Sequence, residues 1–163
     1  MVKTKAVKSF LGLGLVGLLA GLLLVLGCAR TAVPTPIPIP TPTPIPTIKV
    51  TMLVQVNEKD LRWYRDVAVP KGTNAYELTE RITEGNLKAQ WYPAFRSHFV
   101  QGILGVEGKA PFFWLIFLWD ESEQKWEPLP VGSDLFSLHD GHALAWAYTD
   151  TSQKPKPLPV GKP

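Results

Sequence analysis

The chain has 163 residues, a net charge of +3 and a single cysteine, and its residues 1–27 hold three lysines and no acidic residue. The remainder therefore carries 14 basic and 14 acidic residues and is neutral. Without net positive charge or a Lys/Arg cluster, it lacks the electrostatic pattern of a nucleic-acid-binding protein. We therefore expect no nucleic-acid partner.

An apolar run near the N-terminus predicts export. The 18 residues Phe10–Gly27 are only Phe, Leu, Gly, Val and Ala, and they follow three lysines and end directly before Cys28. A basic region, an apolar region and small residues at a cleavage point make up an export signal. Residues 25–28 (Val-Leu-Gly-Cys) resemble a bacterial lipobox, in which the cysteine receives a diacylglyceryl group and becomes the new N-terminus.

The location that follows is extracytoplasmic. We expect a lipoprotein signal peptide at 1–27 and attachment to the cell membrane by a lipid on Cys28. An uncleaved N-terminal transmembrane anchor is the alternative, because about 18 apolar residues just span a bilayer. Both interpretations place the folded part of the chain outside the cytoplasm.

Proline marks the limits of the folded domain. Seven of the 16 prolines occupy every second position from Pro34 to Pro46, and four more lie in the last nine residues. Alternating Thr-Pro and Ile-Pro favours extended polyproline II, because φ is fixed and no ladder donors remain. We expect a Pro/Thr-rich linker at 28–47, either a stalk of about 50 Å or a plain disordered spacer. We also expect a disordered Pro-rich tail at 151–163. The folded domain is then 48–150.

The folded segment is predicted to begin with a hairpin. Apolar residues recur at every second position of 48–56, which is typical of a half-buried strand. The range 61–69 repeats the pattern and is expected to place Trp63 and Val67 on one face. The turn-like residues 57–60 join the two strands.

A short helix is expected next. Asn74 and Glu77 form an Asn-x-x-Glu variant of the capping box. Leu78 and Ile82 fall on one face of this helix, and the Gly-Asn pair at 85–86 predicts its end.

Two later segments are predicted to be strands. Phe112–Trp119 is eight consecutive apolar residues, which favours a strand buried on both faces. In 143–148, alanine alternates with Leu, Trp and Tyr. We expect rings on one side of this strand and methyl groups on the other, with the helix packed against the small side. The sum of the elements predicts an α+β fold with a sheet packed on one helix.

The order of these segments resembles the transcobalamin-like C-terminal domain, found in bacterial surface proteins and as the smaller domain of animal cobalamin carriers. Four segments carry the resemblance, namely Val67–Thr73 with the helix start that follows, Phe99–Gly105, Phe113-Trp114, and Gly132 with the closing segment Leu138–Tyr148. The resemblance implies a β-grasp-like fold for 48–150 and a corrinoid (cobalamin-like) ligand. The animal carriers grip cobalamin between this domain and a large helical barrel. The resemblance thus implies a second ligand-gripping domain supplied in trans.

Aromatic residues give one set of candidate binding residues. The chain has six tryptophans, of which four fall in strand patterns and are predicted to be core, namely Trp63, Trp114, Trp119 and Trp146. Trp91 and Tyr92 precede a proline in a stretch expected to be irregular, and Trp126 flanks a loop. These three are the candidates for an exposed face that stacks on a planar ring or a sugar.

Histidines give the second set. His139 and His142 flank Asp140-Gly141, and two imidazoles with a carboxylate could bind Zn²⁺. Asp-Gly is also typical of a tight turn, and no third ligand stands at a recognisable spacing. We therefore expect no metal, with these two histidines as the candidates if one binds. His98 and His142 are candidate ligand-binding residues, with a structural histidine as the alternative for each.

The sequence does not predict an enzyme. It contains neither a Gly-x-Ser-x-Gly nor a His-Glu-x-x-His motif, which are two common signatures of hydrolytic sites. Two hypotheses remain. The first is a displayed module that binds a small molecule, a corrinoid such as cobalamin or another flat ligand. The second is a structural or adhesive module that recognises envelope glycan or a protein partner.

Overall fold

The computed structural model describes residues 44–163, so the predicted signal peptide, Cys28 and most of the Pro/Thr-rich linker lie outside the described residues. The elements are, in chain order, β1 (Thr47–Asn57), β2 (Asp60–Pro70), α1 (Ala75–Thr83), β3 (Leu87–Tyr92), β4 (Ser97–Ile103), β5 (Val106–Glu107), β6 (Phe112–Asp120), β7 (Lys125–Pro128), the short 3-10 helix η1 (Ser133–Leu135) and β8 (Ala143–Asp150). No helix within 44–163 is long and apolar enough to cross a membrane.

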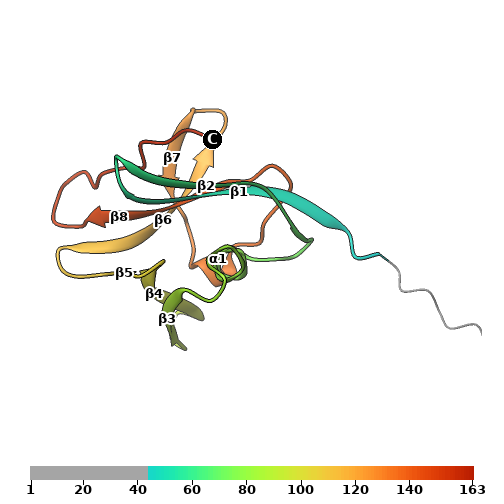
Figure 1. The fold of residues 1–163 in the computed structure, drawn as a ribbon, viewed down its shortest axis with the longest axis horizontal. Helices are drawn as coiled ribbons and strands as arrows, with labels where there is room; N and C mark the ends of the chain where they lie inside the picture. The colour runs from blue at the N-terminus through green and yellow to red at the C-terminus, as the bar shows by residue number, and fades with distance from the viewer. Residues whose placement is uncertain (1–43) are drawn as a thin grey trace, which may run out of the picture. The chain divides into compact units, whose positions relative to one another are not determined.

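The strands form two sheets. The larger has the order β2-β1-β8-β6-β7, and the smaller has the order β3-β4-β5. All pairings are antiparallel except the central pair β1 and β8, which is parallel. Figure 1 shows α1 and the small sheet together on one side of the large sheet. The mixed α+β class, mostly sheet with one helix in the described part, is confirmed.

The helix starts and ends where the sequence predicts. The Asn74 side chain accepts a hydrogen bond from Glu77 N at 2.8 Å, and Glu77 Oε2 accepts one from Asn74 N at 3.0 Å. This reciprocal pair is a complete capping box. At the other end, Glu84 and Gly85 take the left-handed conformation, with φ of 50° and 84°. That conformation ends a helix and favours glycine.

The side of the sheet that the helix covers differs from the prediction. Leu78 lies in one buried cluster with Leu144 and Trp146. The indole Nε1 of Trp146 donates to Thr79 Oγ1 on α1 at 2.8 Å. The helix therefore packs on the large side chains of β8, and not on its alanines. The alanine face instead leaves room for the bulky rings of β6 and β7.

A bulge explains a second difference. The hairpin β1–β2 is confirmed, but Val50 pairs with Val67 while Met52 pairs with Tyr64, so β2 holds one extra residue. An extra residue reverses the alternation of side chains along a strand. Val67 consequently packs into the cluster under the helix, while Trp63 packs on the opposite face. The strict alternation expected from the sequence had placed the side chains of Trp63 and Val67 on one face.

The C-terminal segment 151–163, predicted to be disordered, packs on the alanine face of the large sheet. Gly161 O accepts a hydrogen bond from Trp126 Nε1 at 2.6 Å, and Val160 N donates to Gln55 Oε1 at 2.9 Å. A Cβ on Gly161 would lie 2.8 Å from Trp63 Cζ2, so this backbone rests directly on the indole. The segment has no apolar periodicity, because it acts through single contacts and not as a helix or strand.

The bond between Trp146 and Thr79 gives a stability prediction. Replacing Thr79→Val keeps the side-chain shape but leaves a buried indole N–H without an acceptor, which costs about 1–3 kcal/mol. Urea titrations should show this loss of unfolding free energy. Thr83→Val is the matched control, because Thr83 is also buried and its hydroxyl bonds only to helix carbonyls. Equal losses in the two variants would show that the inter-element bond does not stabilise the fold.

Candidate ligand-binding site

The β3–β4 hairpin presents exposed aromatic side chains. Trp91 and Phe95 are 47% and 73% exposed, and Tyr92 and Phe99 are exposed beside them. Trp91 and Tyr92 belong to strand β3 and not to an irregular stretch as predicted, but their predicted exposure is confirmed. Tyr92 and Phe99 meet edge to face, with ring centroids 6.3 Å apart. Several exposed aromatic side chains on one hairpin are typical of a surface that binds a ligand or a partner protein.

The hairpin turns at residues that fix its shape. Phe95 N donates to Tyr92 O at 3.0 Å and Arg96 N donates to Pro93 O at 3.2 Å. Arg96 has a positive φ of 49°. This turn sets Trp91 opposite His98 in the register of the two strands. The rings of Trp91 and His98 lie 5.0 Å apart, so this exposed tryptophan contacts the histidine, while Tyr92 and Phe99 belong to the other face of the two strands.

A cavity of about 560 Å³ lies beside this hairpin. Its lining comes from β4, β6, β8, the segment from the end of β7 to the start of η1, and the C-terminal segment. It includes His98, Phe99, Trp114, Leu129, Trp146 and Leu158. The lining is mostly apolar, and a volume of this size is usual for a small-molecule site. His98 and Phe99 belong both to the hairpin and to the cavity wall, so the aromatic surface leads into the cavity.

The cavity follows an open edge of the large sheet. β6 pairs with β8 along 112–118, but with β7 only along 117–120. Beyond the start of β7, Leu129 N still donates to Ile116 O at 3.0 Å, and the chain then leaves the sheet. The first half of β6 thus has no strand on this side among the described residues. Side chains of β4 and of the C-terminal segment enclose the resulting space.

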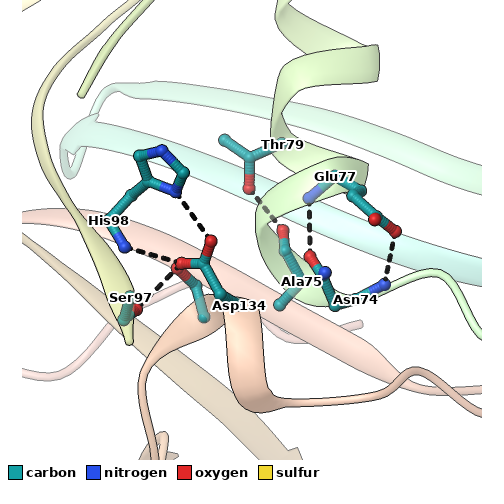
Figure 2. A network of polar contacts seen from close by, with 8 residues as sticks. Asn74, Ala75, Glu77, Thr79, Ser97, His98 and Asp134 are labelled. Atoms are coloured by element: carbon teal, nitrogen blue, oxygen red, sulfur yellow. Dashed lines mark hydrogen bonds and ion pairs between the residues drawn. The ribbon is translucent and has the colours of Figure 1, made fainter. Parts of the chain in front are cut away.

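His98 is held by Asp134 of η1 (Figure 2). The carboxylate Oδ1 lies 2.7 Å from His98 Nδ1, while Oδ2 accepts from His98 N at 2.7 Å and from Ser97 Oγ at 2.8 Å. The ring of Tyr76 stacks on the imidazole with centroids 4.0 Å apart. In the neutral imidazole, a proton on Nδ1 leaves the Nε2 lone pair free, which is the usual state of a ligating histidine.

Electrostatics support a charged Asp134. Burial acts to raise the pKa of this carboxyl, but the hydrogen bonds from His98 and Ser97 outweigh it and hold the pKa below its ordinary value of 3.8. For Tyr76, burial first and then Glu80 and Asp134 raise the pKa to about 12. The stacked pair therefore combines a neutral phenol with an imidazole that contacts a carboxylate.

The three residues Ser97, His98 and Asp134 are not arranged for nucleophilic catalysis. Activation of a serine needs its hydroxyl on the imidazole, with the carboxylate behind the ring. Here the Ser97 hydroxyl donates to the carboxylate itself. The arrangement orients the histidine and ties β4 to η1, and it does not activate the serine.

The second pair of histidines, His139 and His142, also lies close together, but its contacts stabilise a turn. The rings of His139 and His142 lie 5.2 Å apart, and His142 Nδ1 accepts from His139 N at 3.2 Å. The neighbouring Asp140 accepts a hydrogen bond from Lys49 N at 2.7 Å, and Phe136 stacks on His142. Within 44–163, no three of His, Cys, Asp and Glu gather to hold a metal ion. The turn serves to fasten the start of β8 to β1.

Trp126 is a correction to the predicted site. It was expected to be exposed beside a loop, but it is only 4% exposed and packs at 5.2 Å against Trp119 on the alanine face. The C-terminal segment covers it, which explains the error. Asp134 is the residue that the sequence analysis missed. It lies 36 residues from His98 along the chain, and no spacing rule connects a carboxylate in a loop to a distant strand.

Comparison with known proteins gives a fold similarity. No family model and no curated protein sequence matches the chain. A structure of haptocorrin in complex with Cbi matches with a TM-score of 0.54 at 15% identity over 68% of this chain. The match covers only 27% of the haptocorrin chain. A proposed metal binding protein from Ruminococcus gnavus ATCC 29149 matches with a TM-score of 0.47 at 13% identity, over 61% of this chain and 94% of that one.

His142 predicts a pH dependence of stability. Burial first, and then the nearby His139, lower the pKa of His142 below 6.5. As the pH falls through 6.5, His142 becomes protonated in the unfolded chain while it is still neutral in the folded chain. The free energy of unfolding therefore decreases as the pH drops through that value. Urea titrations at about pH 7.5 and 5.5 should show a smaller drop for His142→Phe than for the unaltered protein. The same drop in both would contradict the assignment.

Proposed function

We propose that this protein is a membrane-anchored, extracytoplasmic binding protein whose folded domain takes a flat ligand of the corrinoid class. The observation that carries the proposal is the continuity between the exposed aromatic hairpin and the cavity. Phe99 is exposed on β4 and also lines the cavity of about 560 Å³. A flat ring could thus lie on the hairpin while one edge or substituent enters the cavity.

The chemistry of the surface fits such a ligand. Aromatic faces stack on planar or extended π systems, and an apolar lining favours a ligand with little charge on that side. The His98 imidazole, oriented through Asp134, adds a nitrogen donor beside Trp91. This donor is of the type that binds a transition metal such as the cobalt of a corrinoid.

The similarity to haptocorrin agrees with this ligand class but does not establish it, because a similarity at 15% identity shows the fold alone. This chain spans about a quarter of the haptocorrin length, so the way in which the whole carrier holds Cbi is not transferred. We propose instead that a second domain in trans completes the grip. The strand order around a parallel central pair, with one helix on one face, also supports a β-grasp fold.

The proposal is of a binding module and not an enzyme. The bond of the Ser97 hydroxyl to Asp134 is its support, since this bond directs the serine away from the imidazole. The other hypothesis, an adhesive module for glycan or protein, would use the same exposed rings. Tyr92 and Phe95 lie outside the cavity lining and would be its main contacts.

Binding is tested by titrating a fragment of residues 44–163, which contains both buried clusters, with cobinamide and with hydroxocobalamin. We expect saturable quenching of tryptophan fluorescence together with a shift of the corrin absorption bands. Flat curves with both compounds, combined with retention of the fragment on isolated cell wall, would favour the adhesive module. Flat curves would in any case end the corrinoid proposal.

A pair of phenylalanines gives the matched variants. Phe99→Ala should raise the dissociation constant of cobinamide at least tenfold, because burying a phenyl side chain under the ligand contributes about 1.5–3 kcal/mol. Phe112→Ala is the control, since Phe112 is similarly exposed on a strand but does not line the cavity. Equal effects of the two substitutions would show that the cavity edge is not the site.

The anchor is tested separately on the full chain. In cells fed a radiolabelled fatty acid, the protein should carry label and fractionate with membranes. Cys28→Ser should lose the label, because the thiol is the acceptor in the lipobox interpretation. Label that persists in Cys28→Ser would exclude Cys28 as the lipid acceptor. An unlabelled protein that stays in the membrane with residues 1–27 attached would favour the uncleaved anchor.

A further inference from the structure

The C-terminal segment forms one wall of the cavity. Pro155, Lys156 and Leu158 line it, opposite residues of β4 and β6. The chain then crosses onto the alanine face of the sheet, where Val160 N and Gly161 O make their hydrogen bonds to Gln55 and Trp126. Pro155, Lys156 and Leu158 therefore face the cavity, while the contacts of Val160 and Gly161 hold this segment in place.

We propose that residues 155–161 are part of the ligand-binding site, with 155–158 as a wall that touches the ligand and 159–161 as a latch that positions the wall. The part of the ligand that enters the cavity is apolar and lies beside one anionic group, which the phosphodiester of a cobalamin would supply and cobinamide would not. This inference rests on the proposed function, since it adds residues and a charge preference to the same cavity.

The anionic group follows from Lys156. Among the described residues that line the cavity, it is the one that belongs to Asp, Glu, Lys or Arg. It takes part in none of the ion pairs found within 44–163. The carboxylate of Asp134 is already engaged by four hydrogen-bonding groups and does not line the cavity. A cation at the rim of an apolar cavity favours a ligand that carries a carboxylate, phosphate or sulfonate.

The latch follows from Gly161. Its Cα lies so close to the sheet that an added Cβ would meet Trp63 Cζ2 at 2.8 Å and Leu53 Cδ2 at 3.1 Å. A side chain at this position must push the segment away from the sheet or displace the indole. Because 155–158 has its anchor here, that displacement would move the cavity wall.

Two fluorescent dyes of nearly the same shape separate charge from apolar contact. 1-Anilinonaphthalene-8-sulfonate is anionic, and N-phenyl-1-naphthylamine is its neutral counterpart. We expect the fragment 44–163 to bind both. Lys156→Met should raise the dissociation constant of the anionic dye about two- to fivefold, as for a partly exposed ion pair, and leave the neutral dye unchanged. Lys154→Met is the matched control, since Lys154 does not line the cavity.

The latch is tested with the same dyes. Gly161→Ala should raise the dissociation constants of both dyes about fivefold, because the forced shift displaces the wall. Ile45→Ala should leave them unchanged, because Ile45 is 70% exposed, lies outside the latch and does not line the cavity. Anionic-dye binding that is insensitive to Lys156→Met, or equal effects of Gly161→Ala and Ile45→Ala, would overturn the inference.

A parallel cobinamide titration distinguishes this inference from the proposed function. Dye binding that depends on Lys156 and Gly161, together with flat cobinamide curves, would keep the wall and latch and end the corrinoid proposal. Saturable cobinamide binding that is unaffected by Gly161→Ala would keep the corrinoid proposal and end the wall and latch.

Discussion

The alternation of large and small side chains along β8 is the constraint on which the structure depends. β8 lies between β1 and β6 in the large sheet, and its large residues Leu144 and Trp146 face α1. Its alanines face the other way, onto Phe117 and the rings of β6 and β7. A central strand with two apolar faces needs a cover on each. The helix covers one face, and the C-terminal segment completes the other.

The candidate site lies at the edge of the large sheet where β7 no longer pairs with β6. β7 meets only the end of β6, so the rest of that edge opens into the cavity. Asp134 then fixes the opposite wall, because a half-buried carboxylate is stable only with its hydrogen-bond partners, here Ser97 and His98. The same contact holds the β3–β4 hairpin with its exposed rings at the mouth of the cavity. The contact of Asp134 with Ser97 and His98 thus stabilises the fold and also positions the candidate binding surface.

Local patterns in the sequence predicted local structure well. Asn74 and Glu77 foretold the helix cap, because a capping box lies within four residues, and the alternation in 48–56 foretold β1. Contacts set by tertiary packing were missed. The bulge before Val67 broke the period of two, and the covering segment hid Trp126. Asp134 escaped notice for the same reason, since a loop carboxylate gains its role only when folding brings His98 to it.

The central claim, that the ligand lies on the aromatic hairpin and in the cavity, is tested most directly by nuclear magnetic resonance of the six indole N–H groups. Single Trp→Phe variants assign the signals, and cobinamide is then added. The account predicts that the signals of Trp91, Trp114 and Trp146 move, because these residues lie on the hairpin or line the cavity. The signal of Trp119, which packs on the alanine face, should stay. Movement of Trp119 alone, with the first three unchanged, would contradict the account.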